Sequence, residues 1–446
     1  MKESLLMALW VGFLFVSLGI TARLLRRSWL APGAFFTLYW SIAAVSPLIF
    51  SPYEKVSAGA VMWIFFSTLA VFSGDLVGAL SRKNEQQVKE NVLFSASQIS
   101  FISVIVIFCS IVGMVSFVII FNSAAQNLSL LSVQDFVAVA RKIADTRYTR
   151  AYKPFLTQFL NMFLYAGPLF GGLLVGIENR RRYLIIAALP MLPAVLMTAI
   201  FILRGFIIIS ILLWIGSYLG TRVLVGSQQL FTKRHLVLGL TAVILLFIIV
   251  IGARFARTGF RDTRSIAARS YAEVCKIAFG HMAVFSNWFD RTGLQVKSPL
   301  PGAYTFAGVF NLLGIRKREV GLFTETVTLS NGAPSNIYTV FRVLIEDFTP
   351  LGSLVLLFLI GLLASRIYLR LVQGRARALP ILVAFYASVL WSFITCIWIW
   401  NSIIAAFILF TIGFLIMLEL PNLKESSNSL FSHLGTWYSP RNKLKR

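Results

Sequence analysis

The sequence predicts an all-α polytopic membrane protein with about 11 transmembrane helices, within outer limits of roughly 10 to 14. Hydrophobic residues make up 58% of the 446 residues, and charged residues make up 13%, about half the share typical of a soluble domain. The mean hydropathy is +0.80, and a soluble fold of this length could not bury so much apolar surface. The 39 phenylalanines exclude a disordered chain, because disordered chains are poor in aromatic residues.

A helix needs about 20 largely apolar residues to cross the hydrocarbon of a bilayer. The apolar run between Tyr183 and Gly226 is too long for one crossing, so we expect a tight hairpin at Arg204 and Gly205. A second long apolar run, Leu379–Leu420, is expected to divide near Asn401 into two crossings. The resulting stretches are Ser4–Ala22, Trp29–Phe50, Ala58–Leu80, Ile99–Phe121, Pro154–Ile177, Tyr183–Leu203, Gly205–Gly220, Leu236–Ala253, Leu351–Tyr368, Leu379–Trp400 and Ile403–Leu420. The seventh and ninth are short and should extend by a few residues.

The orientation follows from the basic residues of the short loops. Arginine clusters such as Arg180–Arg182 and Arg366–Arg377 gather on one side, whereas the opposite short loops carry only Lys55 and Arg204. Cytoplasmic loops collect lysine and arginine. The N-terminus is therefore expected outside and the C-terminus inside. Much of the net charge of +24 is explained by this topology, and we expect no nucleic-acid partner.

The predicted crossings divide the chain into four regions. Residues 1–253 form an N-terminal bundle with an interfacial amphipathic segment at 122–153, and residues 254–350 form a large outer loop. Residues 351–420 form the C-terminal helices, and 421–446 form a basic cytoplasmic tail. The first stretch is too long for a signal peptide and lacks a basic cluster before it. Three cysteines cannot form a disulfide framework.

The start of the outer loop carries a stripe of arginines. Arg254, Arg257, Arg261 and Arg264 are spaced 3, 4 and 3 residues apart, which places them on one side of a helix. Guanidinium groups bind phosphate oxygens bidentately and keep their charge. The stripe predicts a pyrophosphate clamp just above the membrane, with a solvated face or an anchor on anionic lipid headgroups as the alternatives.

Arg204 is a second candidate, because it interrupts an apolar run of about 40 residues. An arginine near or inside a span is costly and marks a functional site by default. The alternative is an arginine that snorkels to the outer interface.

The outer loop also contains groups that could transfer a proton. The strongest candidates are His281, Asp347 and Glu273; histidine has a suitable pKa for a base at neutral pH. Adjacent residues on a helix diverge by about 100°, so Glu346 and Asp347 should not face one site. No metal-ligand spacing occurs in the sequence, which disfavours a metal mechanism. The further candidates are Asp290, Glu319 and Glu325.

Two segments resemble bacterial O-antigen polymerases, the oligosaccharide repeat unit polymerases of the Wzy type. Ile202–Ile215, ILRGFIIISILLWI, resembles their arginine-led span. Ser335–Ser353, SNIYTVFRVLIEDFTPLGS, resembles the segment that re-enters the membrane after their large periplasmic loop. The resemblance implies a glycosyltransferase-C-like fold and a multi-pass protein of the bacterial inner membrane, with an active site that faces the periplasm.

The resemblance further implies a metal-independent glycosyltransferase that needs no cofactor. It would transfer a growing glycan from undecaprenyl pyrophosphate to another lipid-linked repeat unit. Arginines would stabilise the leaving pyrophosphate, and a carboxylate or histidine would deprotonate the acceptor hydroxyl. Lipid-linked oligosaccharides, membrane lipids and a candidate chain-length regulator protein are the implied partners. Arg342 would contact the pyrophosphate, and Asn336 and Tyr338 would contact substrate.

Three other functions stay open. An O-antigen ligase uses the same donor but transfers the glycan to lipid A-core, and such ligases carry a histidine in a Gly- and Thr-rich motif that FGHMAVFSNWFD, around His281, lacks. A flippase or transporter would need charged groups within the spans, where Asp75 is the mild exception. A structural protein that binds anionic lipid is the third.

Overall fold

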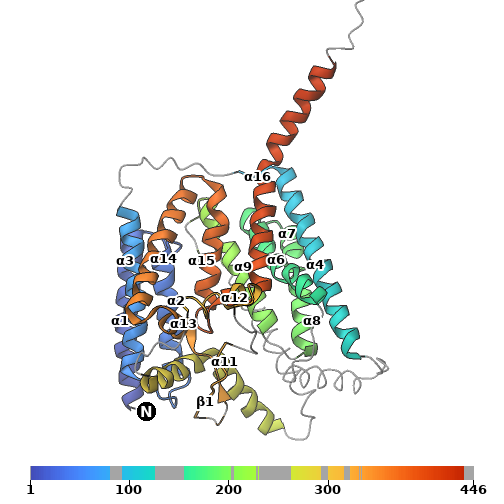
Figure 1. Ribbon diagram of the computed structural model, residues 1–446. Helices are drawn as coiled ribbons and strands as arrows, with labels where there is room; N and C mark the ends of the chain where they lie inside the picture. Colours follow the sequence, from blue (N-terminus) through green and yellow to red (C-terminus); the bar gives the residue numbers. More distant parts are fainter. Residues whose placement is uncertain are drawn as a thin grey trace, which may run out of the picture.

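The computed structural model describes residues 2–80, 93–125, 155–201, 205–227, 230, 263–292, 300–315, 322–330, 332 and 334–435. Within these residues the chain is mainly α-helical, with one two-stranded antiparallel sheet (Figure 1). Nine of the described helical stretches are long and apolar enough to cross a membrane. The chain is therefore an all-α polytopic membrane protein.

The elements are named in chain order in Figure 1. They are α1 (Lys2–Arg26), α2 (Pro32–Phe50), α3 (Ala58–Leu80), α4 (Ala96–Ala125), α6 (Phe155–Ile177), α7 (Arg181–Ala188), α8 (Met191–Phe201), α9 (Gly205–Leu224), α11 (Thr263–Thr292), α12 (Ala307–Leu312), β1 (Val327–Thr328), β2 (Pro334–Ser335), α13 (Thr339–Phe348), α14 (Pro350–Val372), the 3-10 turn η1 (Ala376–Ala378), α15 (Leu379–Trp391), the 3-10 turn η2 (Ile397–Ile399) and α16 (Asn401–Gly435).

Nine of the eleven predicted stretches coincide with the nine membrane-spanning candidates. The two stretches that seemed short extend as expected, to Leu224 in α9 and to Val372 in α14. Helix α8 ends at Phe201, α9 begins at Gly205 and the two helices pack together, as the expected hairpin requires, whereas residues 202–204 between them lie outside the described residues. The predicted span Leu236–Ala253, almost all of the interfacial segment 122–153 and residues 436–446 lie outside the described residues.

The prediction of one continuous span over Leu379–Trp400 is wrong. Helix α15 ends at Trp391, and an irregular segment follows before α16 begins at Asn401. The Val340 backbone N–H, in the first turn of α13, donates to the Ser392 carbonyl at 2.8 Å. Non-helical backbone at membrane depth is tolerated where its polar groups are satisfied inside the protein. The Ser392 carbonyl, just after the end of α15, is satisfied inside the protein by this bond from α13.

The prediction of one continuous helix over Tyr183–Leu203 also needs correction. Helix α7 ends at Ala188 and α8 begins at Met191, with a turn at Leu189 and Pro190 between them. Proline lacks the N–H that would continue the helical ladder, and its ring clashes with the preceding turn. The two short helices still count together as one apolar stretch, Arg181–Thr198, long enough to cross the membrane.

Small residues hold α3 and α14 side by side. A Cβ atom added at Gly74 would collide with the Phe358 carbonyl oxygen, and one added at Gly361 would collide with the Val71 carbonyl oxygen. Membrane helices associate through such close backbone approach, because lipid supplies no hydrophobic drive between them. These glycines allow the close approach of α3 and α14. Helix α14 follows directly after α13 in the chain.

A buried ion pair joins α1 to α3. The Arg26 Nε atom lies 2.9 Å from Asp75 Oδ2, and the Asp75 side chain is fully buried. The guanidinium also donates to Ser365 Oγ on α14 at 3.2 Å and lies over the Tyr368 ring. Asp75, the acidic residue that the sequence analysis noted within a span, therefore has a partner that links three helices.

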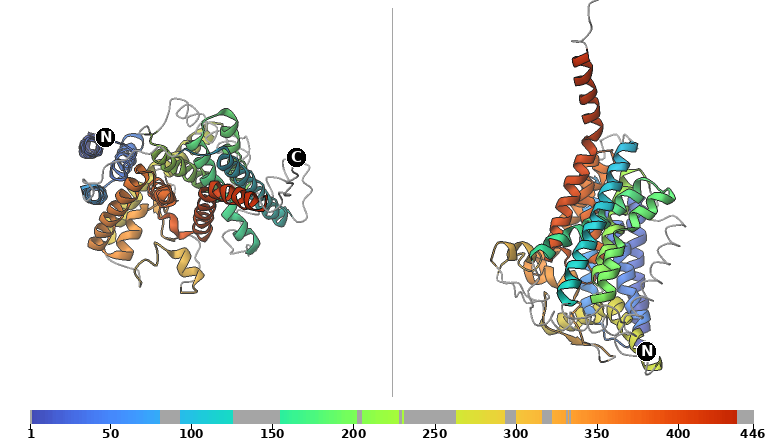
Figure 2. Two further views of the ribbon diagram at one scale, coloured as in Figure 1. Left: turned by 90° about the horizontal axis from the view of Figure 1, so that it is seen from above. Right: turned by 90° about the vertical axis from the view of Figure 1, so that its right-hand side faces the viewer.

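Helix α11 lies across one end of the bundle, where it contacts α2, α3 and α13 (Figure 1). The N-terminus lies at this same end, whereas α16 extends beyond the opposite end (Figures 1 and 2). The predicted outer loop 254–350 contains α11, α12, the β1–β2 sheet and α13, and both α13 and β2 contact α11 at the end of the bundle that carries the N-terminus (Figure 1). We call it the α11 end.

Candidate functional site

Arg342 is the centre of a buried charged cluster on α13. Its Nε–H donates to Glu346 Oε1 at 2.8 Å, and its Nη2 donates to Glu325 Oε2 at 3.1 Å. The exposed fraction of the side chain is 3% for Arg342, 1% for Glu346 and 58% for Glu325. The guanidinium thus joins one buried and one exposed carboxylate.

Aromatic rings cover the faces of the same guanidinium. The Arg342 Cζ atom lies 3.7 Å from the ring centre of Phe323, 4.0 Å from that of Tyr338 and 5.3 Å from that of Trp288. A desolvated cation over an aromatic face gains about 2 kcal/mol. We call the residues Arg342, Glu325, Glu346, Phe323 and Tyr338 the Arg342 cluster. Within the described part of the chain, the Arg342 Nη1 atom is buried without a hydrogen-bond partner.

Asn336 and Tyr338 hold the segment that carries Glu325. The Asn336 Nδ2 atom donates to the Phe323 carbonyl at 3.3 Å, and the Tyr338 hydroxyl donates to the Glu325 carbonyl at 3.0 Å. Burial raises the pKa of the Tyr338 phenol, so its hydroxyl keeps its proton and remains a donor. Asn336 and Tyr338, which the sequence predicts as substrate contacts, therefore hold the backbone carbonyls on both sides of Thr324.

Asp347 fixes the loop before α12. Its Oδ1 accepts from the Tyr304 N–H at 3.0 Å, and its Oδ2 accepts from the Thr305 N–H and hydroxyl, both at 2.6 Å. These bonds place the Tyr304 ring 5.6 Å from that of Phe323, at the edge of the Arg342 cluster. Glu346 and Asp347 thus face different partners, as their adjacency on a helix predicts. The contacts of Asp347 favour a positioning role over proton transfer.

His281 lies in the middle of α11 and is 1% exposed. Its Nε2 is 3.0 Å from the Ala43 carbonyl of α2, and a carbonyl only accepts, so Nε2 carries a proton. Burial lowers the pKa of His281 to about 4, so the ring is neutral at pH 7. The Trp40 ring packs against both His281 and Phe341. This environment is that of a structural histidine, and its role as a base stays a prediction.

The predicted arginine clamp cannot be located. Arg204, Arg254, Arg257 and Arg261 lie outside the described residues. The structure describes Arg264 and Glu273 only as helical backbone in α11. Of the predicted site residues, the structure brings together Asn336, Tyr338, Arg342 and Asp347, which all belong to the segment that resembles the polymerases.

Sequence reasoning did not place Phe323, Glu325 and Glu346 beside Arg342. Glu325 and Glu346 were two among several proton-transfer candidates, and Phe323 was not singled out. The separation of four residues between Arg342 and Glu346 was a usable signal, because such residues are neighbours on a helix. No local pattern connects Phe323 and Glu325 with Arg342, which lies 17 residues after Glu325.

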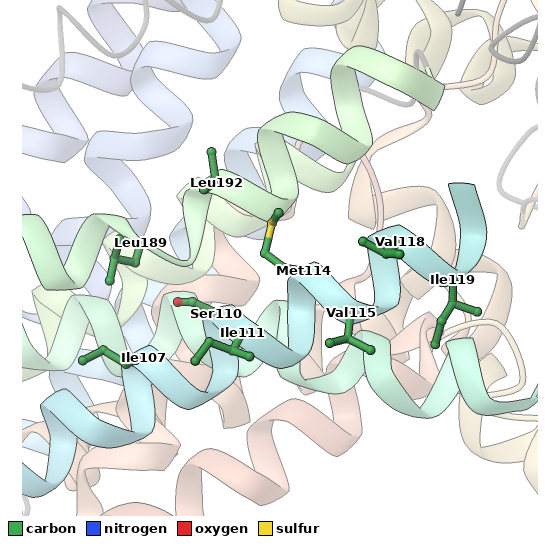
Figure 3. Close-up of a pocket in the computed structure, with 9 residues that line it drawn as sticks. All are labelled: Ile107, Ser110, Ile111, Met114, Val115, Val118, Ile119, Leu189 and Leu192. Carbon is green, nitrogen blue, oxygen red and sulfur yellow. The ribbon is translucent and has the colours of Figure 1, made fainter. Parts of the chain in front are cut away.

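An apolar groove of about 440 Å³ lies between α4 and the α7–α8 pair, away from the charged groups (Figure 3). Its one polar lining side chain, Ser110, donates its hydroxyl to the Val106 carbonyl. No member of the Arg342 cluster lines the groove. Among the described residues, no group of three or more His, Cys, Asp or Glu side chains could hold a metal ion.

Comparison with known proteins gives no family assignment. No family model, no curated protein and no solved structure matches this chain. The resemblance to O-antigen polymerases therefore rests on the residues of the two segments, and the function below rests on the geometry of the Arg342 cluster.

Proposed function

We propose that this protein is a glycosyltransferase of the bacterial inner membrane. It polymerises oligosaccharide repeat units that are linked to undecaprenyl pyrophosphate, for O-antigen or a related surface polysaccharide, on the periplasmic face. The proposal includes no metal ion and no cofactor. A chain-length regulator is a candidate partner, and lipid-linked oligosaccharides are the substrates.

The Arg342 cluster is the observation that supports this proposal. It combines aromatic rings, which pack against the C–H faces of sugars, with carboxylates, which accept hydrogen bonds from sugar hydroxyls. It lies at the α11 end of a bundle of apolar helices. A soluble sugar-binding protein would not need those helices, whereas an enzyme with lipid-linked substrates receives both of them from the bilayer.

The proposed reaction moves one glycan between two carrier lipids. The acceptor hydroxyl attacks the anomeric carbon of the donor glycan, and the bond from that carbon to the pyrophosphate oxygen breaks. The hydroxyl proton passes to a base, and undecaprenyl pyrophosphate leaves with its electron pair. The arginines at 254, 257, 261 and 204 are proposed to stabilise the charge that develops on the leaving group.

Purified protein incubated with lipid-linked repeat units tests the proposal. A ladder of products on a gel supports a polymerase. A single adduct, formed only when lipid A-core is added, would replace the proposal by a ligase. Lipid-linked units that cross a vesicle membrane without covalent change would replace it by a flippase.

A pair of arginine variants ties this activity to the cluster. Arg342→Lys should abolish the ladder, because an ammonium group cannot reproduce the planar fork that bonds both carboxylates and stacks between two rings. Arg370→Lys is the matched control, since Arg370 is exposed near the end of α14, the helix that runs from α13 toward the opposite end. Equal ladders from both variants would separate the activity from the Arg342 cluster.

A further inference from the structure

Glu325 differs from Asp347 and His281 in its access to solvent. Its side chain is 58% exposed, whereas Asp347 is 4% exposed and His281 is 1% exposed. A base must come within hydrogen-bond reach of the hydroxyl that it deprotonates. Of these three groups, Glu325 is the one whose carboxylate a sugar hydroxyl could touch without rearrangement of the helices.

The position of Glu325 is fixed at its backbone and at its carboxylate. The Tyr338 hydroxyl holds the Glu325 carbonyl, and Arg342 Nη2 holds Oε2. Arg342 is held in turn by the buried Glu346 and by the rings of Phe323 and Tyr338. A carboxylate accepts about four hydrogen bonds, and the Glu325 side chain is more than half exposed, so a substrate hydroxyl can reach it.

The chemistry of the cluster indicates which part of the substrate fits here. Its carboxylates can accept hydrogen bonds from sugar hydroxyls, and the rings of Phe323 and Tyr338 can pack against the C–H faces of a sugar. The cluster therefore suits the uncharged hydroxyls of an acceptor sugar.

We propose that the Arg342 cluster is the subsite for the acceptor sugar and that Glu325 is its proton acceptor. This inference rests on the proposed function. The acceptor O–H proton moves to a Glu325 carboxylate oxygen as the acceptor oxygen bonds to the anomeric carbon of the donor. The pyrophosphate leaves with the electrons of its bond to that carbon. Arg342 is a positioning residue that orients Glu325.

The test compares Glu325→Gln with Glu419→Gln. Glu419 is a matched control, because it is 46% exposed and pairs with Arg377 at 2.7 Å, on α16 outside the Arg342 cluster. Glu325→Gln should lower turnover at least about 100-fold, the usual lower range for loss of a general base, and should bind the lipid-linked donor as the wild type does. Glu419→Gln should keep wild-type turnover and donor binding.

Chemical rescue separates loss of the base from loss of folding. Glu325→Ala should be inactive alone, and added formate should restore part of the turnover, because formate supplies the missing carboxylate. A ladder from the wild type and an equal ladder from Glu325→Gln would overturn the role of Glu325 and leave the polymerase standing. Inactive Glu325→Ala that formate does not restore would also overturn it. No ladder from the wild type would instead overturn the proposed function.

Discussion

Arg342 and Glu346 form a buried ion pair one helical turn apart on α13, with Nε and Oε1 separated by 2.8 Å. The pair lies beneath the exposed carboxylate of Glu325, which also binds Arg342. Eight of the ten residues of α13 are buried, this pair included, so α13 is a rigid base for the cluster. Removal of the Glu346 charge takes away the buried carboxylate partner of Arg342 and leaves it the more exposed carboxylate of Glu325.

Glu346→Gln should therefore destabilise the protein by about 3 kcal/mol, the lower range for breaking a buried ion pair. Glu419→Gln breaks an exposed pair and should change stability by less than about 1 kcal/mol. Denaturant unfolding in detergent measures both. Equal stability of the two variants would mean that the Arg342–Glu346 pair is not buried in solution.

Gly74→Ala should destabilise the contact between α3 and α14, because the added Cβ meets the Phe358 carbonyl oxygen of the neighbouring helix. Gly12→Ala is the control, since a Cβ at Gly12 in α1 meets no atom within 4 Å. The thermal unfolding midpoint in detergent should fall for Gly74→Ala and should stay at or above the wild-type value for Gly12→Ala. A Gly74→Ala protein as stable as the wild type would contradict this packing.

His281 should make the stability depend on pH. Burial lowers its pKa from 6.5 in the unfolded chain to about 4 in the folded chain, so the unfolded chain binds the proton first as the pH falls. Stability is then lost between pH 6.5 and about 4, by about 1.4 kcal/mol per pH unit from this group.

His281→Gln keeps a donor for the Ala43 carbonyl and removes this titration. Between pH 7 and pH 5 the variant should lose less stability than the wild type, and at pH 7 it should still make polymer. A pH dependence identical to that of the wild type would show that His281 titrates normally. Loss of turnover with intact donor binding would restore His281 as the base.

The proposed orientation predicts which introduced cysteines react with a thiol reagent that cannot cross the membrane. Tyr53 is 80% exposed in the loop between α2 and α3, where neighbouring Glu54 accepts from Ser330 of the outer loop. In a cysteine-free background, Tyr53→Cys should react in intact spheroplasts. Arg377→Cys, at the start of α15, should react only after the membrane is permeabilised. The reverse pattern would invert the proposed orientation.

The membrane spans could be predicted well from the sequence because a bilayer imposes one requirement, about 20 apolar residues, on each of them. The predicted starts and ends of α3 and α9 lie within a few residues of the observed ones. The early end of α15 could not be predicted, because the largely apolar run continues past Trp391 to Trp400 without a break in the sequence pattern. Helix α11 was also missed, because the charged residues along it hid the apolar positions that pack against α2.

The part of the candidate site that lies in one segment, Ser335–Ser353, could be predicted from the sequence. Asn336, Tyr338, Arg342 and Asp347 fall within the stretch that resembles polymerases, and the structure gathers them at one place. Their partners could not be found in the same way. Glu325 and Tyr304 precede that stretch, and only the folded loop brings them to Arg342 and Asp347.

Mass spectrometry of the products tests the central claim most directly. Purified protein is mixed with one kind of lipid-linked repeat unit, and the masses of the carrier lipids and of the lipid-linked glycans are measured as the reaction proceeds. The proposal predicts that each transfer releases one undecaprenyl pyrophosphate and leaves the lengthened glycan on the carrier lipid of the acceptor unit. Repeat units that keep their original mass, with no release of undecaprenyl pyrophosphate, would contradict it.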